Sequence, residues 1–352
     1  MATSVDPGND RLTRLWRRGA EFLGVEAAIM GGAMSWLSDR HLVAAISNAG
    51  GFGVIACGSM TPDLLGPEID ATFARTERPF GVNLITMHPD LDALIDVCAA
   101  RRVGHVVLAG GLPRSAAIAR IKDSGAKVIC FAPALAMARK LVRIGVDAIV
   151  IEGMEAGGHI GPVATSVLAQ EILPEIHEVP VFVAGGIGRG EAIASYLEMG
   201  ASGCQLGTRF VCATESIAHP AFKKAVIRAK ARDAQISVQL DPKFPVIPVR
   251  ALANKATQRF TEFQREVIDR HRAGEFDLQA AQLEIELFWV GALRRAVIDG
   301  DVESGSVMAG QSVGLVTKEQ STAEIIAELR QQAATALAPR ATSKSETAGT
   351  AI

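Results

Sequence analysis

The chain has 352 residues, of which 49% are hydrophobic, and a formal net charge of -2. That length and apolar content suffice for a large buried core in one or two domains. The nearly balanced charge excludes a general attraction to nucleic acid or to anionic membranes. Residues 1–22 lack the apolar core of a signal peptide, and no uninterrupted apolar stretch approaches about 18 residues. We therefore expect a cytoplasmic protein without a membrane span.

The cysteines and the basic residues indicate no special chemistry. The five cysteines are scattered and show neither a CxxC pair nor a Cys/His metal spacing, so we expect reduced thiols and no metal site. They are Cys57, Cys98, Cys130, Cys204 and Cys212. The basic run 222–232 we interpret as a solvated helix face.

Short apolar runs recur along the first 210 residues. They do not alternate polar and apolar positions, so both faces of each strand should be buried, as in a parallel sheet flanked by helices. The eight runs span residues 27–32, 51–56, 80–85, 105–110, 127–132, 148–153, 179–186 and 203–210.

Segments with helix start and stop signals lie between these runs. Residues 38–50, 89–104, 133–145 and 190–200 begin at Ser-Asp, Pro or Gly and end at Gly. Eight strand-helix units over about 200 residues predict a TIM (β/α)8 barrel. The alternative is a doubly wound open sheet, but no early G-x-G-x-x-G follows the first strand, which argues against a Rossmann start.

After residue 210 the strand-helix rhythm stops. We expect residues 213–277 to be an inserted, mainly helical domain on the substrate side of the barrel. An N-terminal arm would cover 1–22, the barrel would take 23–212 and 278–337, and 338–352 would be a disordered tail. Helical spacing returns at 278–300, and Ser321 with Glu324 has capping-box spacing before a last helix over 321–337. An apolar helical seam at 283–293 favours a homodimer.

Glycine clusters stand where the predicted strands end. A barrel of this type carries its active site at the carboxyl ends of the strands and holds phosphate at the last two of them. The runs "AGGIGRG" (184–190) and "QLGTRF" (205–210) occupy that position. Backbone amides there can hold a dianion, although tight turns alone would also need glycine. Two such clusters in register favour phosphate binding.

The absence of a Walker-type GKS/T run argues against nucleotide hydrolysis, and flavin mononucleotide (FMN) fits the pattern better. Asn83 and Gln205 end their strands on the same side of the barrel and could contact the edge of a flavin ring. Polar residues satisfied by their own strand ends are the alternative for both.

His159 lies in the stretch "IEGMEAGGHIG" (151–161), at the mouth of the sixth predicted strand. It follows two glycines and does not lie on an apolar helical face, so we interpret it as a catalytic or ligand-contacting group. Histidine is a residue type suited to moving a proton from carbon near neutral pH. Glu152 and Glu155 could contact the ring, orient His159 or be solvated loop acids. Glu152, at the strand end, is the better candidate.

The motifs "EGMEAGGHIG", "AGGI", "LGTRF" and "GSVMAGQ" resemble the nitronate monooxygenase family, which includes the flavin-dependent enoyl-acyl-carrier-protein reductase II. The resemblance runs from about Met30 to Leu329. It implies a TIM barrel with non-covalent FMN and a catalytic His159. Relatives often carry Gln near the position of Gly31, so the resemblance does not carry this side-chain contact to the flavin over to the chain. The implied or expected cofactor contacts are Ala33, Met34, Asn83, Glu152, Gly158, Gly185, Gly186, Gln205, Gly207 and Thr208.

The family implies two activities on small molecules. One oxidises an alkyl nitronate with oxygen, and His159 would act as a base or as an anchor for the nitro group. The other takes hydride from NAD(P)H and reduces an enoyl thioester. Residues 278–316 look closer to the reductase, but the sequence as a whole favours nitronate oxidation. A non-catalytic FMN- or phosphate-binding barrel with a structural His159 is the alternative from another class.

Overall fold

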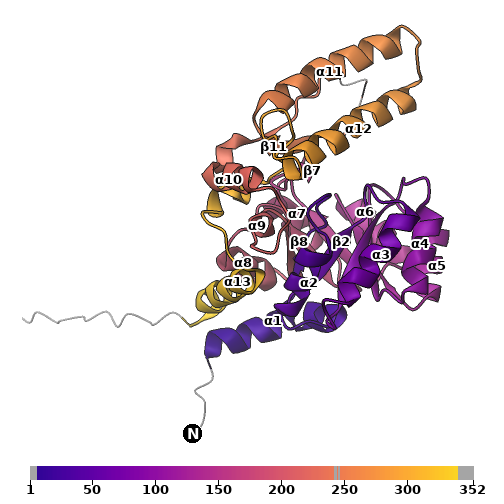
Figure 1. Ribbon diagram of the computed structural model, residues 1–352. Coiled ribbons are helices and arrows are strands. Elements are labelled where there is room, and N and C mark those ends of the chain that lie inside the picture. The colour runs from indigo at the N-terminus through magenta and orange to yellow at the C-terminus, as the bar shows by residue number, and fades with distance from the viewer. Residues whose placement is uncertain (1–5, 242–243, 245, 340–352) are drawn as a thin grey trace, which may run out of the picture.

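The computed structural model describes residues 6–241, 244 and 246–339 (Figure 1). In that part of the chain, eight parallel strands pair in the order β1-β9-β8-β6-β5-β4-β3-β2. A parallel bridge between Met30 and Phe52 joins the first and last strands and closes the barrel. The predicted TIM barrel is therefore confirmed. The strands are β1 Ile29–Gly31, β2 Gly53–Ala56, β3 Phe80–Ile85, β4 His105–Ala109, β5 Lys127–Phe131, β6 Ala148–Glu152, β8 Val181–Ala184 and β9 Gly203–Leu206.

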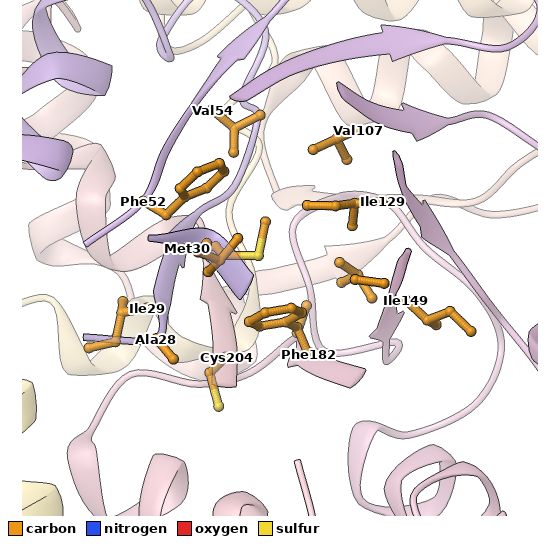
Figure 2. Close-up of a cluster of buried hydrophobic side chains, with 14 of the residues drawn as sticks. Ala28, Ile29, Met30, Phe52, Val54, Val107, Ile129, Ile149, Phe182 and Cys204 are labelled. Atoms are coloured by element: carbon orange, nitrogen blue, oxygen red, sulfur yellow. The ribbon is translucent and has the colours of Figure 1, made fainter. Parts of the chain in front are cut away.

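The apolar runs form these strands because both faces of each strand are covered. Val107, Ile149 and Phe182 are almost completely buried and belong to one cluster with side chains of the outer helices. Figure 2 shows how side chains from several strands meet in this core. Continuous hydrophobicity, and not alternation, is what a sheet buried on both faces requires.

Each helical segment predicted between the strands contains a helix. Asp39 begins α2 by accepting hydrogen bonds from the backbone amides of His41 and Leu42. Gly145 and Gly200 follow α6 and α8 with φ of 89° and 106°, a conformation that ends helices. The outer helices are α2 Arg40–Asn48, α3 Pro62–Phe73, α4 Leu91–Ala100, α5 Ser115–Asp123, α6 Leu135–Arg143, α7 Thr165–Ile172 and α8 Gly190–Glu198.

Helices from the two ends of the chain pack together against the barrel. Leu12 and Trp16 of α1 (Pro7–Leu23) are buried, and α1 contacts α13 (Thr322–Leu337). The predicted capping box is confirmed: the Glu324 amide donates to Ser321 Oγ at 3.2 Å, and the Ser321 amide donates to the Glu324 carboxylate at 2.7 Å.

The last predicted strand, 203–210, is wrong in its second half. β9 ends at Leu206, and residues Thr208–Val211 form the short helix α9. The strand ends there because its pairing with β8 stops at Gln205 and its pairing with β1 stops at Leu206. Arg209 of α9 then forms an ion pair with Glu328 of α13 at 3.0 Å. Gly207 and Thr208 therefore lie in a turn beyond the strand.

The inserted segment forms a cap that contains both helices and strands. Its elements are α10 Pro220–Arg228, η1 Ala231–Asp233, β10 Ala234–Ile236, β11 Val249–Leu252 and α11 Lys255–Arg272. β11 pairs antiparallel with β10 and with β7, Gly158–His159, which comes from the barrel side of the chain. A strand of the cap thus reaches the histidine loop.

Helix α12 (Leu278–Val297) packs along α11 and forms the projecting hairpin of Figure 1. Phe260 and Trp289 join the two helices with ring centroids 4.2 Å apart. The boundary expected between residues 277 and 278 falls inside this hairpin, so we propose a cap of residues 213–300. The chain then returns to the barrel through η2, Gln311–Leu315. Most of the predicted tail lies outside the described residues.

The cysteines and the basic run were expected to have no special role. All five cysteines are buried and free. The basic run is a solvated face only in part. Lys224 and Arg228 of α10 are exposed, but Lys223 is buried and its ammonium donates to the Ala213 carbonyl at 2.7 Å. None of the described helices is long and apolar enough to cross a membrane.

Candidate active site

A cavity of about 490 Å³ opens at the carboxyl ends of the barrel strands, beneath the cap. Barrels of this class carry their active sites at this end. All eleven side chains and glycines expected at the site line this one cavity. They are Ala33, Met34, Asn83, Glu152, Gly158, His159, Gly185, Gly186, Gln205, Gly207 and Thr208.

The floor of the cavity is polar and set by strand register. Glu152 lies beside Ala184, and Ala184 beside Gln205, so these residues stand at one level of the barrel. Asn83 donates to the carbonyl of Val107 on the next strand at 3.1 Å. Gln205 is only 7% exposed, and its amide makes no hydrogen bond within the described residues. It therefore presents a free donor and acceptor to whatever occupies the cavity.

The loops after β8 and β9 line one end of the cavity, and their glycines expose main-chain atoms there. Gly185 and Gly186 have φ of 99° and 69°, a region that side chains disfavour. A Cβ on Gly186 would also lie 2.9 Å from the Cβ of Glu155. Thr208 is fixed opposite, because its hydroxyl accepts the amide of Gly310 at 2.9 Å.

The stretch 151–161 is held from outside the barrel by residues 309–311. A Cβ on Gly157 would lie 2.6 Å from the backbone of Gly310, so only glycine permits this approach. The amide of Gln311 donates to the Glu155 carbonyl at 2.9 Å. The Glu155 carboxylate accepts both the amide and the hydroxyl of Thr165, at 2.9 and 2.8 Å. Glu155 therefore braces its loop and is not a free acid.

His159 is positioned by the cap. It pairs with Val249 in the small sheet, and the next amide, of Ile160, donates to the carbonyl of Pro248 at 3.0 Å. Arg250, which is 3% exposed, donates to the Met154 carbonyl at 3.0 and 2.8 Å. The imidazole itself is exposed at the cavity. Arg250 is a positioning residue that the sequence did not reveal, since nothing in its neighbourhood predicts pairing with a distant loop.

Glu152 and His159 are the titratable side chains that line this cavity in the described part of the chain. Burial raises the pKa of the Glu152 carboxyl to about 7, and the nearby His159 opposes that shift. Near neutral pH the floor therefore carries a carboxyl that is easily protonated, facing a histidine across the site.

The apolar roof comes from the cap and the return segment. Ile247, Leu293 and Met308 line the cavity on this side, and the sequence singled out none of them. Phe244 of the cap does not line the cavity, because it is buried in the core between α11 and α12.

The cavity fits a planar cofactor that carries a phosphate. Its floor offers a free amide at Gln205, and its glycine loops leave backbone exposed where side chains would collide. Gly31, the position of the departure from relatives, lies against Ile46 and not in the cavity. No group of three metal-binding side chains occurs among the described residues. Fold and site together define the class: a TIM-barrel enzyme with a capped active site.

Comparison with known proteins identifies the family. The nitronate monooxygenase family model matches residues 17–96 and 90–332, so the chain belongs to the nitronate monooxygenase family and is a flavin-dependent oxidoreductase. Its relatives differ in activity. An "(3aS,4S,5R,7aS)-5-hydroxy-7a-methyl-1-oxo-octahydro-1H-indene-4-carboxyl-CoA dehydrogenase" from Mycobacterium tuberculosis is 30% identical over 87% of this chain and 92% of its own.

Two solved structures extend the comparison. FabK from Thermotoga maritima is 36% identical, with a TM-score of 0.79 over 92% of this chain and 95% of its own. Nitroalkane oxidase from Streptomyces ansochromogenes is 26% identical, with a TM-score of 0.74 over 90% of this chain and 98% of its own.

Proposed function

We propose that the chain is an FMN-dependent oxidoreductase that acts on an acyl thioester, with reduction of an enoyl thioester at the expense of NAD(P)H as the reaction to test first. The observation that carries this proposal is the apolar roof of Ile247, Leu293 and Met308 above His159, which suits an acyl chain better than a small nitronate. FabK, a type II enoyl-acyl-carrier-protein reductase, and the CoA-ester dehydrogenase support the same substrate class.

We assign one group of cavity residues to the phosphate of FMN and a second group to its ring. Gly185, Gly186, Gly207 and Thr208 would hold the phosphate through backbone amides and a hydroxyl. The flat ring would lie against small residues of the floor and the histidine loop. Its polar edge would meet the remaining donors and acceptors. These ring contacts are Ala33, Met34, Asn83, Glu152, Gly158 and Gln205.

The bound flavin supplies hydride transfer. Reduction of a carbon-carbon double bond adds that hydride to one carbon and a proton to the other. His159, exposed at the cavity and held by the β7–β11 pairing, is the residue that we propose gives this proton. The cap excludes water from the apolar side of the substrate.

Anaerobic flavin absorbance tests the proposal. NAD(P)H should bleach the flavin of the purified protein, and crotonyl-CoA should restore the oxidised spectrum. Propyl-2-nitronate, added without NAD(P)H, is the competing substrate. Bleaching by the nitronate alone, with no reoxidation by the thioester, would overturn the proposal.

Nitronate oxidation is the second candidate, and the match to the family model favours it. His159 would then remove a proton or anchor the nitro group, and oxygen would be the acceptor. The discriminating result is rapid nitronate turnover in air that does not depend on NAD(P)H.

We also propose a homodimer formed through α12. Leu283, Leu287 and Val290 lie on one side of this helix and are 59%, 58% and 41% exposed. Apolar residues at this spacing favour packing against another helix. The cytoplasmic location stays a prediction.

A further inference from the structure

A second cavity adjoins the active site from outside the barrel. It measures about 470 Å³ and shares Gly185, Gly186, Ile187 and Ser312 with the first cavity. The two cavities therefore meet at the loop that we propose as the phosphate site. The second one lies between α8, the η1 segment of the cap and η2.

Charge is unevenly distributed around this meeting point. The side chain of Glu155 lies beside Gly186, with its carboxyl carbon 4.0 Å from where a Cβ on Gly186 would stand, so a phosphate at Gly186 has a carboxylate next to it. Coulomb repulsion in a partly buried site would oppose a dianion there. Backbone amides offset part of this cost, but a full positive charge would offset more.

The nearby arginines are already engaged. Arg189 pairs with Glu191 at 2.5 Å, and Arg209 pairs with Glu328 at 3.0 Å. Arg250 donates to backbone carbonyls of the histidine loop and the cap. None of these three lines either cavity within the described residues.

Lys230 is the one lysine or arginine that lines either cavity in the described part of the chain. Its backbone is fixed at the start of η1, where its amide donates to Asp233 at 2.7 Å. The adjoining Ala231 lies against Gly314, at which a Cβ would be 3.0 Å from the Ala231 nitrogen. The exposed ammonium makes no ion pair within the described residues.

We propose that Lys230 supplies the cation that neutralises the flavin phosphate, and so links the cap to the cofactor. This inference rests on the proposed FMN cofactor. Lys230 thereby becomes a specificity-determining residue for a phosphorylated flavin over riboflavin, which has the same ring and no phosphate.

Binding of FMN and of riboflavin to the flavin-free protein tests this inference by fluorescence titration. Lys230→Met should raise the Kd for FMN about tenfold and leave the Kd for riboflavin within about twofold. Lys230→Arg should restore FMN affinity. Lys224→Met, which removes an exposed lysine of α10 that lines neither cavity, should change neither value.

Equal FMN affinity in wild type and Lys230→Met would overturn the inference while leaving the proposed function intact. So would an equal loss of riboflavin affinity, because that result would indicate a disturbed cap and no contact with phosphate. A wild-type protein that binds neither flavin would refute the proposed function itself.

Discussion

His159 is the side chain on which the proposed chemistry depends. It combines an exposed imidazole with a rigid backbone, because β11 holds its strand and Arg250 holds the preceding loop. Glu152 differs: it is set into the floor of the cavity, and burial raises the pKa of its carboxyl. Replacing His159 should therefore change turnover, and replacing Glu152 should change how stability depends on pH.

Replacement of His159 by Ala should abolish most turnover and spare the cofactor. Loss of a general acid typically costs a factor of about 100 to 10,000, so kcat should fall by at least about 100-fold, while visible flavin absorbance persists. His177→Ala, at an exposed position outside the cavity, is the control. Full turnover by His159→Ala with every active substrate would show that the histidine is structural.

Replacement of Glu152 by Gln should change how stability depends on pH. Between pH 4.5 and about 7 the unfolded wild type loses the Glu152 proton while the folded protein retains it. The free energy of unfolding therefore falls as pH rises through this window and is flat above it. Glu152→Gln lacks this loss, so its free energy of unfolding relative to wild type should rise by about 3 kcal/mol from pH 4.5 to 8.

Urea denaturation of the flavin-free proteins measures this difference. Burial lowers the pKa of His105 to about 4, which makes stability fall as pH drops from 6.5. That contribution is present in both proteins and cancels in the comparison. Parallel stability curves for the two proteins would contradict the prediction.

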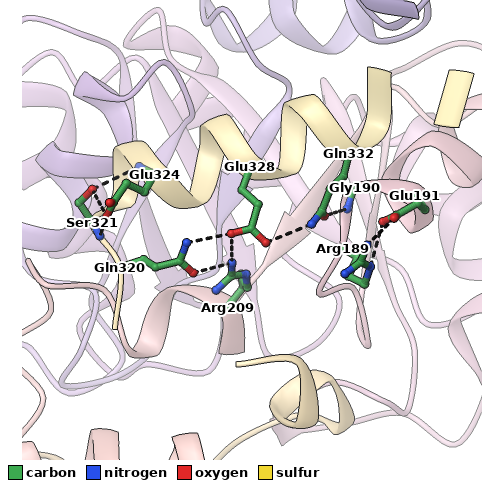
Figure 3. A network of polar contacts seen from close by, with 9 residues as sticks. All are labelled: Arg189, Gly190, Glu191, Arg209, Gln320, Ser321, Glu324, Glu328 and Gln332. Carbon is green, nitrogen blue, oxygen red and sulfur yellow. Dashed lines mark hydrogen bonds and ion pairs between the residues drawn. The ribbon is translucent and has the colours of Figure 1, made fainter. Parts of the chain in front are cut away.

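At the scale of elements, helix α13 fixes the two helices behind the proposed phosphate loops. Figure 3 shows the network: Gln332 accepts the amide of Gly190, the first residue of α8, at 2.8 Å, and donates to Glu328 at 3.0 Å. Glu328 also accepts from Arg209 of α9, which is 4% exposed. Gln320 accepts a further bond from Arg209 at 2.9 Å.

Glu328→Leu should destabilise the protein by about 2 kcal/mol, because it leaves the buried Arg209 without its counter-charge. The partial exposure of Glu328 keeps the value below that of a fully buried pair. Glu191→Gln, in an exposed pair with Arg189, is the matched control and should change stability by less than about 0.5 kcal/mol. Equal effects in urea unfolding would contradict the proposed role of the network.

At the scale of the whole molecule, the cap is joined to the barrel at its base and extends away from it as a hairpin. β11 pairs with β7 beside the active site, and η1 contacts η2 beside the second cavity. The hairpin of α11 and α12 has its own core around Phe260 and Trp289 but leaves the outer side of α12 exposed. The base of the cap can therefore line the active site, while the outer side of α12 is free to form the proposed contact with a second copy of the chain.

Leu287→Lys should convert a dimer into a monomer in sedimentation equilibrium, because a charge would have to be buried at the proposed contact. Leu64→Lys replaces a leucine of α3 with the same exposure, 59% against 58%, and should leave the mass unchanged. A monomeric wild type would refute the proposed dimer.

Most of the barrel could be predicted because its signals are local. Continuous apolar runs, glycine stops and the Ser321–Glu324 box depend on neighbours in sequence. The predicted strand at 203–210 is wrong after Leu206, since its pairing with both neighbouring strands stops there and Arg209 finds its partner on α13 far along the chain. The cap strands were missed for the same reason: β11 exists through pairing with the distant residues Gly158 and His159.

The sequence by itself determined the barrel, the family and eleven of the residues that line the cavity. The expected residues follow the carboxyl ends of the strands in the sequence, and closure of the barrel brings these strand ends together at one end of the molecule. Only the tertiary structure decided that Glu155 braces a loop, that Arg250 holds the histidine segment, and that Lys230 lines the second cavity with Gly185 and Gly186. The contact of Glu155 with Thr165 spans 10 residues, whereas that of Arg250 with Met154 spans 96. No local pattern specifies which of these contacts form.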